Sequence, residues 1–135
     1  MQKEINEYIR LGEINSLRID RVTEPGIYLM SQDEEETVLL PNAYITDDMQ
    51  IDSLLDVFIY TDSEDRLVAT TLTPKAMINE FALLEVVDTA PFGAFVDIGL
   101  PKDLLVPRNK QKNPFSVGEK RFVRVIEDEE SGRLI

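Results

Sequence analysis

Residues 84–98 read LEVVDTAPFGAFVDI, and this stretch decides the fold. Two short runs rich in β-branched, aliphatic and aromatic residues flank a turn that contains Pro91 and Gly93. Short apolar runs separated by turn residues predict a β-hairpin. We expect Gly93 to provide the bulge or bend that lets the second strand curl around a small barrel.

The same alternation continues along the whole chain and predicts an all-β protein. Glycine and proline recur at short intervals, and the runs between them are rich in Val, Ile, Leu, Thr and aromatic residues. This pattern is typical of many short strands. The expected strands are 16–22, 27–30, 38–40, 56–60 and 67–72, followed by 81–87, 94–98, 104–106, 121–126 and 133–135.

The two sets of strands look like copies. Residues 24–29 align with 91–96, and 38–42 with 104–108, at an offset of 67 or 66 residues. Because a unit of this size with five strands suits a small closed barrel, the sequence predicts two tandem five-stranded OB-fold barrels. The expected organisation is a first domain over 1–73, a linker over 74–80 and a second domain over 81–135.

The second copy stops at Ile135, part-way through its expected fifth strand. We therefore expect the second barrel to be truncated in that strand and the chain to be a fragment of a longer protein.

Composition removes several classes of chemistry. The chain has no cysteine and no histidine, which excludes disulfides, thiolate zinc sites and histidine general bases. It contains no phosphate-binding glycine loop, and its acidic runs lack metal-ligand spacing. The sequence thus predicts a non-enzymatic binding protein without a cofactor or a metal. It shows no apolar run long enough to span a membrane and no signal peptide, so we expect a cytoplasmic protein.

The charge is distributed unevenly. The net charge is −12, yet residues 1–80 hold 17 acidic and 6 basic side chains, whereas residues 81–135 hold 9 and 8. Within 102–124 there are 7 basic and 2 acidic residues. A cationic segment in an acidic chain favours a nucleic-acid partner for the second half. The alternative is a solvated, lysine-rich loop.

Residues 84–98, with Gly118–Lys120 and the ending Gly132–Ile135, resemble the S1 RNA-binding domain. The first half resembles the leading domain of the conserved virulence factor B family (CvfB, YitL-like), as does the run 99–107. In that family a string of S1-type domains precedes a winged-helix domain. The resemblance implies a bacterial, gene-regulatory protein that binds single-stranded RNA, mainly through the second domain, and is not an enzyme.

The resemblance also implies which residues contact RNA. S1 domains bind RNA with two aromatic residues around strand two, here Phe92 and Phe95, and with an arginine at the start of strand five, here Arg133. Because two rings three positions apart normally face opposite sides of a strand, one of them could instead fill the core. Pro107 stands where S1 domains often carry a histidine, which puts the base preference in doubt.

The remaining candidates come from position and charge. Arg108 and Lys110 follow Pro107 and are expected to contact phosphates. Arg124 has the opposite strand parity to Val123 and Val125, so we expect it on the binding surface. The predicted RNA-binding set is Phe92, Phe95, Arg108, Lys110, Arg124 and Arg133.

The first copy is expected to bind RNA weakly or not at all. Pro25 and Tyr28 stand at the positions of the two phenylalanines, Arg66 at that of Arg133, and the local charge repels phosphates. Its acidic surface suits protein partners instead. The alternative function for the whole chain is therefore an OB-fold adaptor that docks proteins and has little affinity for RNA.

Overall fold

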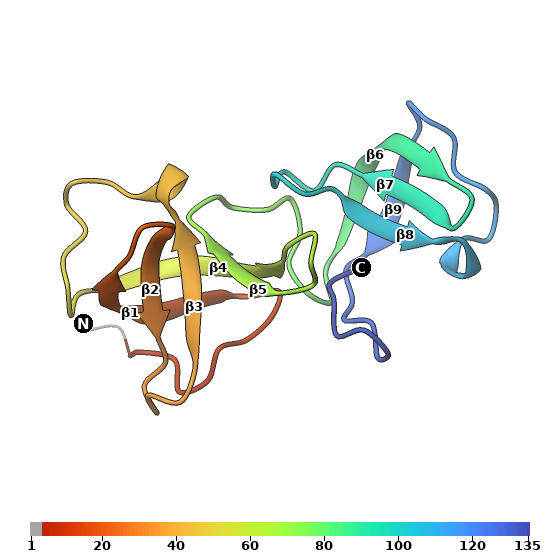
Figure 1. The fold of residues 1–135 in the computed structure, drawn as a ribbon. Helices are drawn as coiled ribbons and strands as arrows, with labels where there is room; N and C mark the ends of the chain where they lie inside the picture. The colour runs from red at the N-terminus through yellow and green to blue at the C-terminus, as the bar shows by residue number, and fades with distance from the viewer. Residues whose placement is uncertain (1–3) are drawn as a thin grey trace. The chain divides into compact units, whose positions relative to one another are not determined.

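The computed structural model describes residues 4–135, and the chain divides between Leu72 and Thr73 into two compact units, each built around β-sheet (Figure 1). The prediction of an all-β protein is confirmed, since the regular elements of the described residues are nine strands and two short 3-10 helices. None of the helices in residues 4–135 has the length and apolar character needed to cross a membrane.

The first unit is a closed barrel in which strands pair in the order β1-β2-β3-β5-β4. Only the β3–β5 pair is parallel, with Leu39 opposite Val68. The barrel predicted for the first half is therefore present. Its elements are β1 (Ile14–Val22), β2 (Gly26–Met30), β3 (Thr37–Pro41), the 3-10 helix η1 (Asn42–Tyr44), β4 (Leu54–Thr61) and β5 (Leu67–Thr70).

Strand alternation fills the inside of this barrel. Every second residue of β1 points inward, so that Leu17 and Ile19 are fully buried while their neighbours are partly exposed. Leu29 and Leu40 join them from β2 and β3. Burying a side chain of this size contributes about 1.5–3 kcal/mol relative to leaving it in water, which explains why so short a chain holds a barrel.

The second unit is a four-stranded antiparallel sheet in the order β8-β7-β6-β9. The expected fifth strand is represented by a single bridge between Glu127 and Leu134 and by two hydrogen bonds between Ile126 and Ile135. A curled sheet thus stands where a second barrel, truncated in its fifth strand, was predicted. Its elements are β6 (Phe81–Ala90), β7 (Gly93–Val96), β8 (Leu104–Pro107), the 3-10 helix η2 (Arg108–Lys110) and β9 (Lys120–Arg124).

The bulges lie elsewhere than expected. The register shifts between Ile19 and Arg21 in β1 and between Val86 and Asp88 in β6, whereas the strands that begin at Gly93 and Gly26 run without a shift. Of the bulge or bend expected at Gly93, the bulge is therefore absent.

The glycines instead permit a close approach of two strands. A Cβ added at Gly93 would lie 2.5 Å from the carbonyl oxygen of Val106 on β8. Gly26 has the same close neighbour in the carbonyl of Leu40. Only a residue without a side chain fits there, so strand two can fold over strand three at this corner.

Residues 74–80, expected as a linker, pack against the second unit. The Lys75 amide donates to the carbonyl oxygen of Ile98 at 2.8 Å, and the Asn79 amide donates to that of Val125 at 2.7 Å. Ala76 between them is buried. Backbone pairing at both ends makes this segment part of the unit that follows it.

One ion pair ties this segment to Asp97, the residue that follows β7. Lys75 Nζ lies 3.0 Å from Asp97 Oδ2, and the Gly99 amide donates to Asp97 Oδ1 at 2.8 Å. The ammonium of Lys75, followed by the Gly99 N–H, lowers the pKa of Asp97 below its usual value.

Asp97→Asn is expected to destabilise the second unit at pH 7 by no more than about 1 kcal/mol, because the pair is solvent-exposed. A lowered pKa in the folded state gives stability above the unfolded-state pKa and loses it as the pH falls through the folded value. The difference between Asp97→Asn and the parent chain should therefore close in acid. Thermal unfolding followed by far-UV circular dichroism at pH 7 and at about pH 2 measures it. Equal destabilisation at both pH values would contradict the electrostatic origin.

Candidate nucleic-acid interface

The turn between β6 and β7 presents two phenyl rings. Phe92 lies immediately before Gly93 and is 60% exposed. Phe95 is half-buried on the outer face of β7, while Ala94 and Val96 point into the core. The two ring centroids are 6.0 Å apart at an interplanar angle of 87°, an edge-to-face contact. Because Phe92 belongs to the turn, strand alternation does not force it inward, and neither ring fills the core.

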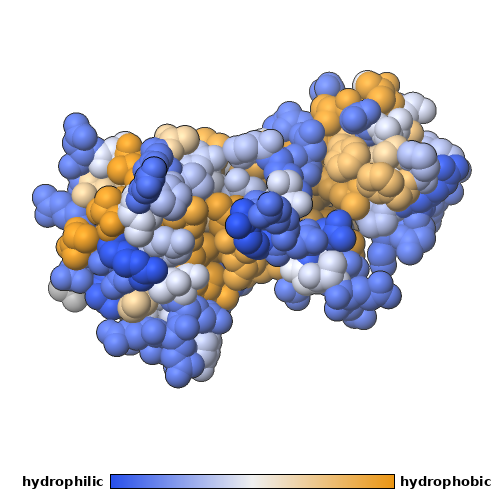
Figure 2. All heavy atoms as spheres, in the orientation of Figure 1, coloured by the Kyte–Doolittle hydropathy of each residue, from blue (hydrophilic) through white to orange (hydrophobic). Residues whose placement is uncertain are grey.

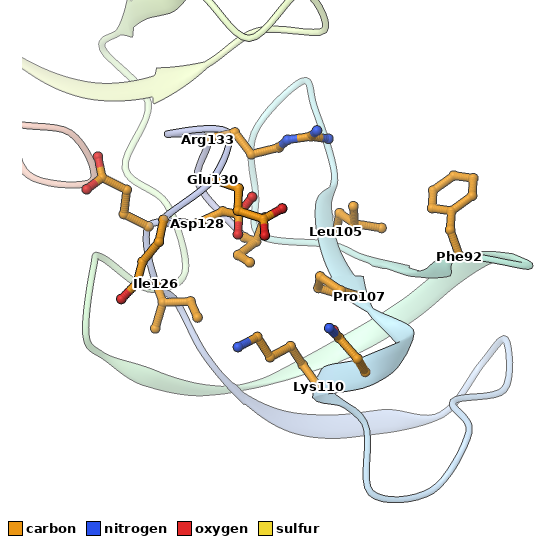
Figure 3. Close-up of a pocket in the computed structure, with 12 residues that line it drawn as sticks. Phe92, Leu105, Pro107, Lys110, Ile126, Asp128, Glu130 and Arg133 are labelled. Carbon is orange, nitrogen blue, oxygen red and sulfur yellow. The ribbon is translucent and has the colours of Figure 1, made fainter.

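A groove of about 600 Å³ runs beside Phe92. Figure 3 shows Phe92, Leu105 and Pro107 on one side of it and the segment from Ile126 to Arg133 on the other. The groove is lined by Phe92, Leu105, Pro107, Asn109, Lys110, Ile126, Glu127, Asp128, Glu129, Glu130, Arg133 and Ile135. Two cations of the predicted set, Lys110 and Arg133, thus lie around the same groove as the exposed ring.

Lys110 and Arg108 are placed by the 3-10 helix η2, which begins directly after β8. The Lys110 side chain extends toward Ile126 in Figure 3. Arg108 turns the other way: its backbone amide donates to the Phe92 carbonyl at 2.9 Å, and its Nη1 lies 3.5 Å from the Pro91 carbonyl oxygen. Arg108 therefore flanks the aromatic turn from outside the groove.

Arg133 belongs to a tight turn that closes with Gly132 at a φ of 72°. Its Nε donates to Ser131 Oγ at 3.1 Å, and that hydroxyl donates to Asp128 Oδ2 at 2.6 Å. The Ser131 hydroxyl is the main group that lowers the pKa of Asp128, with the charge of Arg133 contributing. The arginine is thus held beside carboxylates, which partly offset its charge.

Arg124 does not line the groove beside Phe92 but lines a neighbouring pocket, which shares Lys110 and Ile126 with that groove. It is on the outer face of β9, with Nη2 3.3 Å from Asn79 Oδ1 and its guanidinium carbon 5.7 Å from the Phe81 ring centroid. Strand parity correctly predicts that it points outward. Parity says nothing about which part of the surface it reaches, because that depends on pairing with β6.

The corresponding place in the first unit is arranged differently. Tyr28 is half-buried, and the guanidinium carbon of Arg21 lies 4.3 Å from the centroid of its ring. Arg66 contacts Asp62 at 3.1 Å and Glu64 at 2.8 Å. The groups that would meet a nucleotide are thus already paired within the unit. The Arg21–Tyr28 contact depends on the register shift in β1, so simple alternation could not have predicted it.

Tyr60 of β4 interacts with Tyr44 of η1. Burial, followed by interaction with Tyr44, raises the pKa of Tyr60 to about 12. Tyr60 is therefore neutral at any physiological pH and serves as a hydrogen-bonding core residue. Its counterpart in the second unit is Ile126, on the wall of the groove.

The chain is similar to several known proteins. Residues 11–72 match the family model of the S1 domain. The chain is 40% identical over 102 residues to the uncharacterized protein YitL of Bacillus subtilis, a match covering 75% of this chain and 34% of that protein. It is 30% identical over 99 residues to conserved virulence factor B of Staphylococcus saprophyticus, with 72% and 33% covered.

The fold is similar to a crystal structure from Streptococcus pneumoniae described as a multidomain protein with nucleic acid binding domains. The TM-score is 0.76 at 22% identity, and the match covers 92% of this chain and 44% of the other. The chain spans about one third of the length of the curated relatives. With the S1 match in its first unit and these relatives, the chain belongs to the CvfB/YitL-like family of S1-domain proteins.

Proposed function

We propose that this chain binds single-stranded RNA without catalysing a reaction, and that the second unit makes the main contacts. The observation that carries the proposal is the Phe92 ring, 60% exposed at a turn between Arg108 and the groove with Lys110 and Arg133. The S1 domain match and the description of the pneumococcal structure support a nucleic-acid ligand.

The proposed contacts follow from simple physics. An unpaired base stacks on the open face of Phe92, which contributes about 1–3 kcal/mol. Phe95 supports that ring from the side through the edge-to-face contact. Arg108 and Lys110 meet the phosphates on either side of the stacked base.

The carboxylates of the groove shape selectivity rather than affinity. Glu129 and Glu130 face the same groove as Phe92 and repel phosphates. A carboxylate accepts hydrogen bonds from base amino groups, which cytosine carries and uracil lacks. The backbone therefore runs on the Arg108 and Lys110 side, with base edges turned toward the acidic turn.

We further propose that the second unit is itself an S1-type barrel, in which the bridge between Glu127 and Leu134 stands at the place of the fifth strand. Its pairing supports this: Gly93 lies opposite Pro107 as Gly26 lies opposite Pro41. β9 pairs with β6 as β4 pairs with β1. The hydrophobic floor of the groove then belongs to the barrel interior, and RNA contacts the rim.

The cellular role follows from the family. We propose a cytoplasmic, gene-regulatory RNA-binding protein in which these two units act with further domains. Among residues 4–135 no group of three or more acidic side chains is arranged to hold a metal ion.

The competing function is a protein-docking adaptor. The observation that favours it is the charge of the first unit, whose residues 1–72 include 16 acidic and 5 basic side chains. Such a surface repels phosphates and suits a basic protein partner.

Phe92→Ala is expected to weaken binding of a fluorescent single-stranded RNA by about fivefold or more, because it removes the stacking surface. Binding of the parent chain should also weaken as salt is raised, since phosphate contacts release counterions. Fluorescence anisotropy at two salt concentrations measures both effects.

Val117→Ala is the matched control, because this side chain is similarly exposed but does not line the groove. The adaptor function would be favoured if the parent chain did not bind RNA. It would also be favoured if the RNA affinity changed neither with salt concentration nor on substitution of Phe92.

A further inference from the structure

A second apolar surface lies on the outer face of β6 and β9. Phe122 is 76% exposed, Phe81 71% and Leu83 49%. Leu83 lies directly opposite Phe122 in the register, and Phe81 lies opposite Arg124. Directly opposite residues share a face, so these side chains form one patch, which we call the Phe81–Phe122 face.

Exposed aromatic rings on this face are specific to the second unit. At the corresponding positions of β1 and β4 the first unit carries Ile14, Ser16 and Asp56, of which only Ile14 is a large apolar side chain. Leu84 and Val86 of β6 point inward and are buried, so β6 has an apolar inner face in addition to the exposed apolar residues on its outer face. Large rings held in water on a strand face mark a contact surface.

The charges around the rings indicate what covers them. Lys120, Phe122 and Arg124 alternate along β9, so a cation stands on each side of the ring. The Arg124 guanidinium also lies over Phe81, 5.7 Å from its centroid. Glu85, opposite Lys120, is the one acidic side chain among the paired outward residues of these two strands. Cations interleaved with rings on a flat sheet complement a chain of phosphates and bases.

We propose that the Phe81–Phe122 face is a second contact surface for single-stranded nucleic acid. Bases stack on Phe122 and Phe81, and phosphates meet Lys120 and Arg124. The inference rests on the proposed function but uses other side chains, since none of these four residues lines the groove beside Phe92. Phe122 and Arg124 line a neighbouring pocket that borders the groove at Lys110 and Ile126.

Two surfaces on one unit make affinity depend on RNA length. A short oligonucleotide occupies one surface at a time, whereas a longer one reaches both and gains from the raised effective concentration of the second contact. Loss of the Phe81–Phe122 face should therefore affect long RNA most.

Phe122→Thr tests this directly. Threonine keeps β-propensity, and so exposed a ring contributes little to the core, so the fold should be retained. We expect the affinity for a fluorescein-labelled oligocytidine of about 20 nucleotides to fall about fivefold or more, and that for one of about 6 nucleotides to stay within about twofold. Anisotropy titration measures both, and circular dichroism checks folding.

Leu54→Thr is the matched control, because Leu54 is an exposed apolar residue on the corresponding face of the first unit. No change in the long-RNA affinity of Phe122→Thr would overturn the inference while leaving the groove intact as a site. Equal weakening for both RNAs would place Phe122 in the same site as Phe92 and contradict a separate surface.

Two further outcomes would also overturn it. In the first, light scattering shows that the parent chain dimerises, and Phe122→Thr abolishes dimerisation but not RNA binding. The Phe81–Phe122 face would then be the interface with a second copy of the chain. A parent chain that binds neither RNA would remove the proposed function as well.

Discussion

Gly26→Ala is expected to destabilise the first unit by about 3 kcal/mol or more. A methyl group at Gly26 would overlap the carbonyl of Leu40 on the neighbouring strand, and the residue has a φ of 155°, which side chains rarely adopt. The obstacle is backbone that belongs to the β2–β3 ladder, so the structure cannot give way without breaking pairs that close the barrel.

The chain supplies its own reporter for this measurement. All four tyrosines lie in the first unit and the chain has no tryptophan, so tyrosine fluorescence during urea unfolding follows that unit alone. The midpoint for Gly26→Ala should move to much lower urea. An unchanged tyrosine transition would show that the backbone around Gly26 and Leu40 can move apart to accommodate a methyl group, which would contradict this prediction.

Substitutions at two other glycines test steric overlap and backbone strain separately. Gly93 has no positive φ, so Gly93→Ala tests the overlap with the Val106 carbonyl alone. Gly118 has a φ of 91° and nothing within 4 Å of an added Cβ, so Gly118→Ala tests backbone strain alone. Both lie in the second unit, and both should leave the tyrosine transition in place while lowering the unfolding midpoint seen by circular dichroism.

Asn15→Ala is expected to cost the first unit about 3 kcal/mol. Asn15 is fully buried, and its Oδ1 accepts from the Arg10 amide at 2.8 Å. Its Nδ2 donates to the carbonyl oxygens of Arg10 at 2.9 Å and Glu13 at 2.8 Å. Alanine leaves one donor and two acceptors of the backbone without these partners, and burial makes each loss expensive.

Tyrosine-monitored urea unfolding gives the size of this effect, and hydrogen exchange at the Arg10 amide shows where it arises. Asn42→Ala is the control, because Asn42 is exposed and makes one side-chain bond, to the carbonyl of Glu24 at 2.6 Å. It should cost no more than about 1 kcal/mol. Equal losses in the two variants would mean that burial of Asn15 carries no penalty.

Much of the fold could be predicted because strand patterning is local. The alternation that buries Leu17 and Ile19 is visible in the sequence, and so is the matching pattern around Phe92. The positions of the bulges were not predictable, since a bulge is a mismatch between two strands and leaves no mark on either strand alone.

The candidate site was predicted in part for the same reason. The prediction that Phe92 is exposed depends on the turn residues around it, which the sequence shows. That Lys110 and Arg133 lie around one groove depends on how η2 and the last turn fold back, which is set by long-range pairing. The contact between Arg124 and Phe81 could not be predicted, because the two residues lie far apart in sequence and meet only through the pairing of β6 with β9.

Figure 2 shows hydrophilic side chains over most of the visible surface, with hydrophobic patches on both units. Composition alone, dominated by the net charge of −12, argues against a nucleic-acid partner.

The equivalent registers of the two units have a practical consequence. The offset is 67 at Gly26 and Gly93 and becomes 66 at Pro41 and Pro107, and the change falls in the loop between the second and third strands. Exchange of the leading hairpins between the units should therefore yield chimaeras that keep every hydrogen-bonded pair. Such chimaeras would place the turn that carries Phe92 in the acidic first unit. Their RNA affinities would show how much the rest of each unit contributes to binding.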